Sequence, residues 1–151
     1  MCRFLGETAF FTDACGKPHA QNGVPFNLSH SGDWALLAVG EQEIGCDIEQ
    51  IRLTNTLRLG KTVFTDAEMA ALRQSPERLG TFFTFWTKKE ALLKCMGKGF
   101  HRAAKSVDVC GGTFAEDGHV YTMGTKLFAD YAVSVCVRDG AVDMTTEWVR
   151  F

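Results

Sequence analysis

Residues 44–51 read IGCDIEQI and residues 81–99 read TFFTFWTKKEALLKCMGKG, and these two stretches decide the fold. The first has the alternation of period two that is typical of a β-strand. The second carries a mostly apolar face with spacings of three and four, which predicts an α-helix: Phe82, Phe85, Lys89, Leu92 and Met96. We therefore expect a strand over 44–51 and a long helix over about 77–96, ended by Gly97 and Gly99.

The segments around these stretches predict further strands and one more helix. Thr65 and Glu68 match a capping box, so a second helix should run over 66–74. Two runs joined by a Gly-Asp turn precede the first stretch, and with it they predict an antiparallel meander: 26–31, 34–40 and 44–51. Weaker alternation predicts four later strands: 106–111, 119–124, 131–137 and 145–151. Helices on one face of such strands give an α+β class, with an antiparallel sheet packed against the long helix.

The composition is that of an ordinary globular domain. Of 151 residues, 12 are Phe and 3 are Trp, which is too much aromatic surface for a disordered chain to leave in water. The length predicts one domain over 1–151, in which residues 1–23, rich in Gly and polar side chains, form a lead-in arm. A formal charge of −2 argues against a general attraction to nucleic acid or to an anionic membrane, so an anion site must be a local patch.

Localisation signals point to the cytoplasm. The apolar runs are far shorter than the about 20 residues of a membrane span, and the first residues lack the apolar core of a signal peptide. The six cysteines lie far apart, without the spacing of a zinc site or a redox pair, and they suit a reducing compartment. We expect no nucleic-acid partner and no membrane partner.

Two carboxylates stand out in the predicted strand. The strand period places Asp47 and Glu49 on one face, where two neighbouring negative charges are unfavourable unless a cation or a shared proton intervenes. The alternative is that this pair simply faces water at a strand edge.

A third carboxylate lies on the long helix. Trp86, Glu90 and Lys94 recur at intervals of four and form one stripe, which Trp86 would partly shelter. If Glu90 approached Asp47 and Glu49, the three carboxylates would form an oxygen-ligand site that suits Mg²⁺ together with substrate phosphates. The alternative is an ordinary surface ion pair of Glu90 with Lys94.

Positive side chains gather around this glutamate. Between residues 88 and 105 six lysines and arginines face the single acidic residue Glu90, which makes a local anion patch or a solvated basic face: Lys88, Lys89, Lys94, Lys98, Arg102 and Lys105. His30 lies between two serines at a predicted strand end, where it is either structural or, with Ser29, a donor to a phosphate oxygen. The residues alone thus indicate a magnesium–phosphate site and leave the reaction open.

Several segments, in order, resemble the motifs of the 4′-phosphopantetheinyl transferase superfamily. FNLSHSGDWALLAV, IGCDIEQI and FFTFWTKKEALLKCMGKGF resemble its F-N-x-S-H-S, G-x-D-x-E and W-x-x-K-E-A-x-x-K elements. GKPH at 16–19 and VFTDAE at 63–68 resemble two further elements. The resemblance covers about residues 16–100, and it implies transfer of phosphopantetheine from coenzyme A to a serine of an acyl or peptidyl carrier protein, releasing 3′,5′-ADP.

The resemblance also implies roles for individual residues. The Mg²⁺ ligands would be Asp47, Glu49 and Glu90. The coenzyme A contacts would be Lys17, Ser29, His30, Lys89 and Lys94, with Ser29 and His30 at the 3′-phosphate. Glu90 would be the base for the serine hydroxyl, and Lys94 would stabilise the leaving group. Arg102 and Lys105 are candidates for steering an acidic carrier protein.

The chain length sets further expectations. Larger members of this superfamily have two lobes, whereas this chain resembles one, so we predict a homo-oligomer, a dimer or a trimer, in which a neighbour completes the site. Two alternatives stay open: a catalytically impaired remnant that binds coenzyme A or serves as a scaffold, and a Mg²⁺-dependent phosphohydrolase that uses the same carboxylates.

Overall fold

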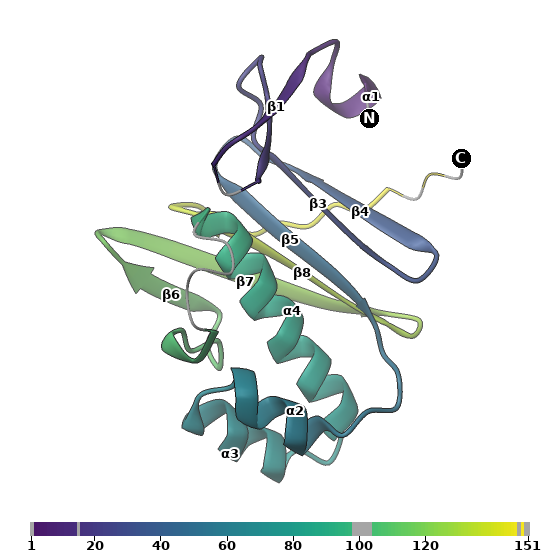
Figure 1. Cartoon of the computed structure of the whole chain (residues 1–151), viewed down its shortest axis with the longest axis vertical. Coiled ribbons are helices and arrows are strands. Elements are labelled where there is room, and N and C mark those ends of the chain that lie inside the picture. Colours follow the sequence, from purple (N-terminus) through teal and green to yellow (C-terminus); the bar gives the residue numbers. More distant parts are fainter. Residues whose placement is uncertain (1, 15, 98–103, 148, 150–151) are drawn as a thin grey trace.

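The long helix α4 (Arg78–Met96) lies across one face of a four-stranded antiparallel sheet of order β5-β8-β7-β6 (Figure 1). The strands are β5 (Ile44–Gln50), β6 (Thr113–Glu116), β7 (His119–Phe128) and β8 (Tyr131–Arg138). The computed structural model describes residues 2–14, 16–97, 104–147 and 149. The α+β class predicted from the sequence is confirmed.

Helix and sheet touch most closely at Gly45 in β5. A Cβ atom on this residue would lie 2.1 Å from the carbonyl oxygen of Ala91 and 2.4 Å from the backbone nitrogen of Cys95. Only a residue without a side chain allows the two backbones to approach so closely. The face of β5 that carries Gly45 therefore points at α4, and the next residues on that face are Asp47 and Glu49.

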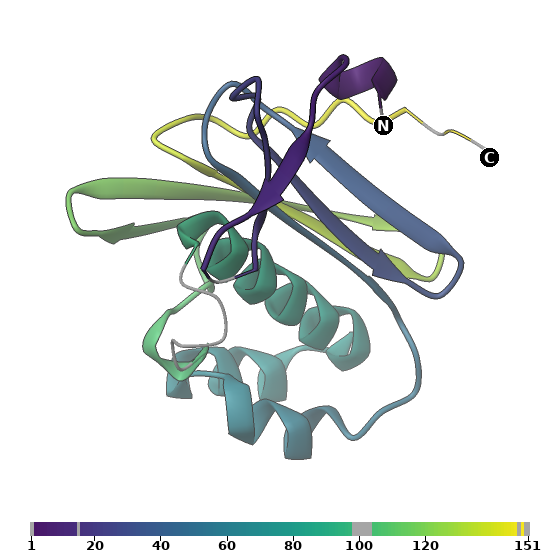
Figure 2. The same cartoon turned by 45° about the horizontal axis from the view of Figure 1, so that its top comes forward.

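The main hydrophobic core lies on the same side of the sheet. Figure 2 shows α4 between the sheet and two shorter helices, α2 (Thr56–Val63) and α3 (Asp66–Gln74). The predicted apolar face of α4 belongs to this core, since its members are buried or, for the last, half-buried: Phe82, Phe85, Lys89, Leu92 and Met96. No helix in the described part of the chain is both long and apolar enough to cross a membrane.

Both predicted helices are confirmed with their end signals. Thr65 caps α3: its hydroxyl accepts a hydrogen bond from the Glu68 backbone, and the Glu68 side chain accepts one from the Thr65 backbone. At its other end α4 stops at Gly97, which has the left-handed φ of 65°. Helix α2 was not predicted, because Gly60 interrupts its helical pattern; a Cβ there would lie 2.8 Å from the Met69 sulfur.

The strands before α2 form a different arrangement from the predicted meander. β3 (Phe26–Ser31) and β4 (Trp34–Val39) pair only with each other within the described residues, whereas β5 pairs with β8. The meander is therefore wrong at β5, although all three strands exist. Figure 1 shows β3 running beside β5 all the same, and their contact is made by side chains.

The first 23 residues are more regular than a lead-in arm. They contain the short helix α1 (Cys2–Leu5) and a two-stranded sheet of β1 (Phe10–Thr12) and β2 (Pro18–Ala20). A small cluster of buried side chains attaches this arm to β3: Leu5, Ala20 and Phe26.

The later part of the chain confirms two of the four predicted strands, β7 and β8. The prediction of a strand over 106–111 is wrong: this segment begins at the end of a single 3₁₀ turn, η2 (Ala104–Ser106), and joins no sheet among the described residues. The Val107 carbonyl oxygen accepts from Lys89, and the Val109 N–H donates to Glu68. The prediction over 145–151 is also wrong for its described residues, 145–147 and 149, which hold no strand. Strand β6 was not predicted.

Candidate active site

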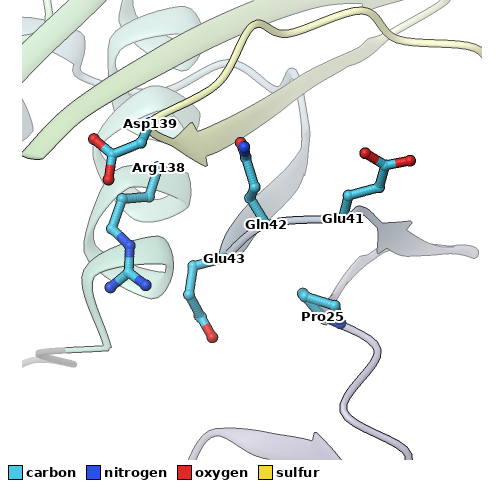
Figure 3. A pocket seen from close by; sticks show the side chains of 6 residues that line it. All are labelled: Pro25, Glu41, Gln42, Glu43, Arg138 and Asp139. Carbon is cyan, nitrogen blue, oxygen red and sulfur yellow. The ribbon is translucent and has the colours of Figure 1, made fainter.

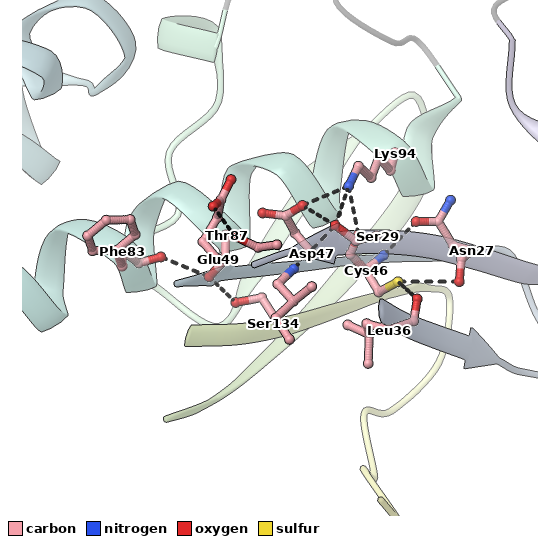
Figure 4. A network of polar contacts seen from close by, with 12 residues as sticks. Asn27, Ser29, Leu36, Cys46, Asp47, Glu49, Phe83, Thr87, Lys94 and Ser134 are labelled. Carbon is pink, nitrogen blue, oxygen red and sulfur yellow. Dashed lines mark hydrogen bonds and ion pairs between the residues drawn. The ribbon is translucent and has the colours of Figure 1, made fainter. Parts of the chain in front are cut away.

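Asp47 is the centre of a polar cluster between β5 and α4 (Figure 4). Asp47 is only 4% exposed to solvent. The ammonium of Lys94 donates to Asp47 Oδ1 at 2.7 Å, and the hydroxyl of Ser29 donates to the same oxygen at 2.8 Å. Lys94 also reaches Ser29 Oγ at 3.2 Å and the carbonyl oxygen of Cys46 at 3.1 Å. Three elements, β3, β5 and α4, thus meet at one carboxylate.

The second oxygen of this carboxylate lacks a partner. Asp47 Oδ2 is buried and receives no hydrogen bond from the described part of the chain. Burial raises the pKa of Asp47, and the charge of Lys94 and the Lys94 and Ser29 hydrogen bonds oppose that rise. A buried carboxylate oxygen without a donor is unusual, and a bound cation would satisfy it. The alternative in which the pair of Asp47 and Glu49 simply faces water is wrong for Asp47, which is buried.

Glu90 lies one helical turn before Lys94 on the half-buried stripe predicted for α4. Burial raises the pKa of Glu90, and the negative charge of Asp47 raises it further, with a smaller contribution from Glu49. The negative charges of Asp47 and Glu49 therefore repel that of Glu90. The alternative of a surface pair between Glu90 and Lys94 is wrong, because Lys94 pairs with Asp47.

A metal site is not already formed by these side chains. Across residues 2–14, 16–97, 104–147 and 149, no group of three acidic, His or Cys side chains is placed so that it could hold a metal ion. The residues fit a hard cation in donor chemistry, since Asp47 Oδ2 is free and Glu49 and Glu90 are near. Ligand atoms from a substrate would have to complete the coordination, as is usual for Mg²⁺.

Ser31 joins the cluster, although the sequence did not single it out as a site residue. Its hydroxyl donates to Glu49 Oε2 at 2.9 Å. The alternation of Asn27, Ser29 and Ser31 along β3 was the available signal, because polar side chains two residues apart on a strand share a face.

Lys89 does not join the cluster. Its side chain is 3% exposed and forms an ion pair of 2.8 Å with Glu68, whose side chain is 0% exposed. The ammonium also donates to the carbonyl oxygens of Ala104 and Val107. Lys89 thus lies on the core side of α4 with its donors engaged, and the sequence-based assignment of Lys89 to coenzyme A receives no support from this geometry.

The remaining predicted contacts lie apart from Asp47. Lys17 pairs with Glu43 at 2.6 Å, beside a pocket of about 410 Å³ (Figure 3). The pocket lies at the turn before β5 and the end of β8, lined by Pro25, Glu41, Gln42, Glu43, Arg138 and Asp139. His30 is exposed, and the strand period puts it on the face of β3 opposite to Ser29. Lys98 and Arg102 lie outside the described residues, and Lys105 is exposed on η2.

Comparison with known proteins places this cluster in a family. The sequence model of the 4′-phosphopantetheinyl transferase superfamily matches residues 43–140, which include β5, α4 and the rest of the sheet. The chain belongs to this superfamily, as the motifs indicated.

Curated relatives agree with that result. The chain is 36% identical over 118 residues to the 4′-phosphopantetheinyl transferase psf-1 of Bacillus pumilus, covering 76% of this chain and 49% of the relative. It is 49% identical over 88 residues to the 4′-phosphopantetheinyl transferase AcpT of Salmonella typhi, covering 54% and 46%. The chain spans about half the length of the curated relatives it matches.

A solved structure supports the fold. The holo-[acyl-carrier-protein] synthase of Thermotoga maritima superposes with a TM-score of 0.52 at 14% identity, over 66% of this chain and 64% of that one. At this identity the similarity supports the fold, whereas the family assignment rests on the sequence matches.

Proposed function

We propose that this chain transfers the 4′-phosphopantetheine group of coenzyme A to a serine hydroxyl of an acyl or peptidyl carrier protein and releases 3′,5′-ADP. The observation that carries the proposal is the buried carboxylate of Asp47, held on one oxygen by Lys94 and Ser29 and, among the described residues, without a partner on the other. It lies in the segment that the family match covers.

The proposed reaction forms one bond and breaks one bond at a phosphorus of the coenzyme A diphosphate. The serine oxygen of the carrier attacks this phosphorus, its proton leaves, and the bond to the departing 3′,5′-ADP oxygen breaks. Negative charge grows on that leaving oxygen, so a cation positioned there lowers the barrier. Lys94 is our candidate, because its half-buried ammonium is already fixed by Asp47 and Ser29.

Asp47, Glu49 and Glu90 are the residues that would hold a Mg²⁺ ion. Bound there, the ion would neutralise charge on the diphosphate. The donor chemistry supports this part of the proposal through the free Asp47 Oδ2 and the neighbouring carboxylates.

Glu90 is our candidate base for the serine hydroxyl. In the absence of a cation, burial and Asp47 raise the pKa of Glu90, so its carboxylate takes up a proton more readily than an exposed one. For binding of coenzyme A we keep Lys17, Ser29 and His30 as proposed contacts, although Lys17 and Ser29 must exchange their present partners to bind a phosphate. Lys89 is left out of the set because its ammonium is engaged in the core.

Two further parts of the proposal concern assembly and location. We propose a homo-oligomer, a dimer or a trimer, for which exposed apolar side chains near the arm and the β3–β4 hairpin offer a surface: Phe4, Phe10, Phe11, Leu28 and Val39. Light scattering that finds a fully active monomer would contradict it. We place the reaction in the cytoplasm, because four described cysteines are free thiols and suit a reducing compartment: Cys46, Cys95, Cys110 and Cys136.

The test is an assay of carrier modification. The purified chain is incubated with coenzyme A, Mg²⁺ and an apo carrier protein, and mass spectrometry follows the carrier. We expect the carrier to gain the mass of one phosphopantetheine, and we expect no gain with a metal chelator or with Asp47→Asn.

Other outcomes select the alternatives. Binding of coenzyme A without any mass gain would indicate the impaired remnant. Release of phosphate from coenzyme A without a carrier would indicate the phosphohydrolase. Either outcome would reject the transferase proposal.

A further inference from the structure

Strand β5 is at the edge of its sheet, and side chains of β3 take the place of a neighbouring backbone. Its N–H groups at Cys46, Ile48 and Gln50 point away from β8, toward β3. These three N–H groups donate, respectively, to Asn27 Oδ1 at 2.9 Å, to Ser29 Oγ at 3.4 Å and to Ser31 Oγ at 3.1 Å. Three alternate side chains thus satisfy the edge, and the spacing of two on both strands keeps them in register.

The two serines of this ladder use their hydroxyls both as acceptors and as donors, and Ser29 also accepts from Lys94. A hydroxyl has one hydrogen to donate and two lone pairs to accept. Ser29 accepts from β5 and donates to Asp47, and Ser31 accepts from β5 and donates to Glu49 at 2.9 Å. Because the backbone bond fixes each hydroxyl oxygen, the hydrogen is left for the carboxylate one residue earlier on β5.

The two carboxylates depend on their serines to different degrees. Asp47 Oδ1 has a second donor in Lys94, which by itself would keep that side chain in place. Within the described residues, Ser31 is the one hydrogen-bond donor to the Glu49 carboxylate. Ser31 is itself held at the end of β3 by the turn at Gly32, which has a φ of +55° and leaves no room for a Cβ beside the Tyr131 hydroxyl.

From this geometry we propose that Ser31 is a positioning residue, which holds the Glu49 carboxylate in the orientation needed to bind a divalent cation together with Asp47. This inference rests on the proposed function, which requires that cation. Ser31 touches neither the cation nor the substrate in this proposal, and it acts through Glu49 alone. Outer hydrogen bonds of this kind orient ligands, and their loss commonly weakens metal binding about 10–100-fold.

The test measures Mn²⁺ binding, with Mn²⁺ as the probe because it prefers the same oxygen ligands as Mg²⁺. Electron paramagnetic resonance counts free Mn²⁺ in a titration of the full chain with coenzyme A present. We expect Ser31→Ala to weaken Mn²⁺ binding about 10–100-fold. We expect Ser31→Thr, which keeps the hydroxyl, to stay close to the wild type.

Ser75→Ala is the matched control for the backbone bond. Ser75 Oγ accepts from the Glu77 backbone at 3.1 Å, the same distance as the bond from Gln50 to Ser31, but no carboxylate depends on it. Loss of the Ser75 hydroxyl in this variant should leave Mn²⁺ affinity unchanged. Should Ser31→Ala not fold, Ser31→Cys keeps the shape of the side chain with a weaker donor, and it should also weaken Mn²⁺ binding.

The outcomes separate this inference from the proposed function. A folded Ser31→Ala variant that binds Mn²⁺ as tightly as the wild type would overturn the positioning role and leave the transferase proposal intact. A wild-type chain that binds no Mn²⁺ in the presence of coenzyme A would overturn both.

Discussion

Two lysines of helix α4, Lys89 and Lys94, each pair with a buried carboxylate, yet their surroundings differ. Residues five apart on a helix lie about 140° apart around its axis, so the two ammoniums leave on different sides. Lys89 reaches Glu68 in the core at 2.8 Å, and Lys94 reaches Asp47 at the face of β5 at 2.7 Å.

The first pair is closed. Glu68 accepts hydrogen bonds from the backbones of Thr65 and Val109, each at 2.8 Å, while Lys89 donates to two backbone carbonyls beside its ion pair. Every charged atom has partners, and together they attach the segment after η2 to α3 and α4. This pair can therefore stabilise the fold but has no capacity left for a ligand.

The second pair is open. The Lys94 side chain is 30% exposed, and one buried oxygen of Asp47 has no donor in the part of the chain that the structure describes. The comparison teaches that a buried ion pair is not by itself a functional signal. What distinguishes the candidate site is the unsatisfied oxygen of Asp47 and the access of Lys94 to solvent. Three experiments test this contrast.

The largest effect is expected from Lys89→Met. It leaves the Glu68 carboxylate charged and unpaired in the core, so the free energy of unfolding should fall by about 3–5 kcal/mol. Equilibrium unfolding in urea measures this. The double variant Lys89→Met with Glu68→Gln removes both charges and should recover much of the loss. If the free energy of unfolding of Lys89→Met stays within about 1 kcal/mol of the wild type, the pair does not stabilise the fold as proposed.

Lys94→Met should have the opposite profile. Transfer activity should fall about 100–1000-fold, as for other groups that stabilise charge in a transition state. Stability should change far less than in Lys89→Met, since Asp47 can take up a proton and the site is partly open to solvent. The carrier assay and urea unfolding together measure this split, with Lys61→Met on the exposed side of α2 as control. Equal loss of stability in the two lysine variants would abolish the contrast.

The smallest expected effect is a change with pH in the contribution of Glu90 to the free energy of unfolding. Because burial and Asp47 raise the pKa of Glu90, the folded state binds a proton more readily than the unfolded state. Stability from this group is thus present below the ordinary Glu pKa of about 4.3 and is lost as pH rises through the raised folded value. With metal chelated, the stability of Glu90→Gln relative to the wild type should therefore increase as the pH rises through that range.

Urea unfolding between about pH 4 and about pH 8 measures this trend, because that range begins near the ordinary Glu pKa of about 4.3 and extends above it. Glu77→Gln, at an exposed position, is the control and should show no comparable change. If the difference in free energy of unfolding between Glu90→Gln and the wild type stays constant over this range, Glu90 does not titrate in a buried environment. The open site would then consist of Lys94 and Asp47 without Glu90.

Local signals predicted a large part of the fold. The capping box at Thr65 and the left-handed Gly97 delimit helices whose bounds agree with the sequence to within about one residue, because capping depends on neighbours in the chain. The strand over 106–111 failed for the opposite reason. Val107 and Val109 have buried apolar side chains like strand residues, but the Val107 carbonyl oxygen and the Val109 N–H bond to Lys89 and Glu68, which are distant in sequence.

The site shows the same division. Period two put Asp47 and Glu49 on one face, and period four put Glu90 and Lys94 on one stripe, so local periodicity was enough to predict which side chains could act together. The sequence also determined the family, through motifs in a fixed order.

The partners of these side chains follow from how the elements pack. The tertiary structure assigned Lys94 to Asp47 and Lys89 to Glu68, left one carboxylate oxygen unsatisfied, and set the serines of β3 against the edge of β5. The physical reason is that periodicity fixes the direction of a side chain relative to its own element. Which charge or donor it meets depends on how elements distant in the chain pack, and no local pattern encodes that packing.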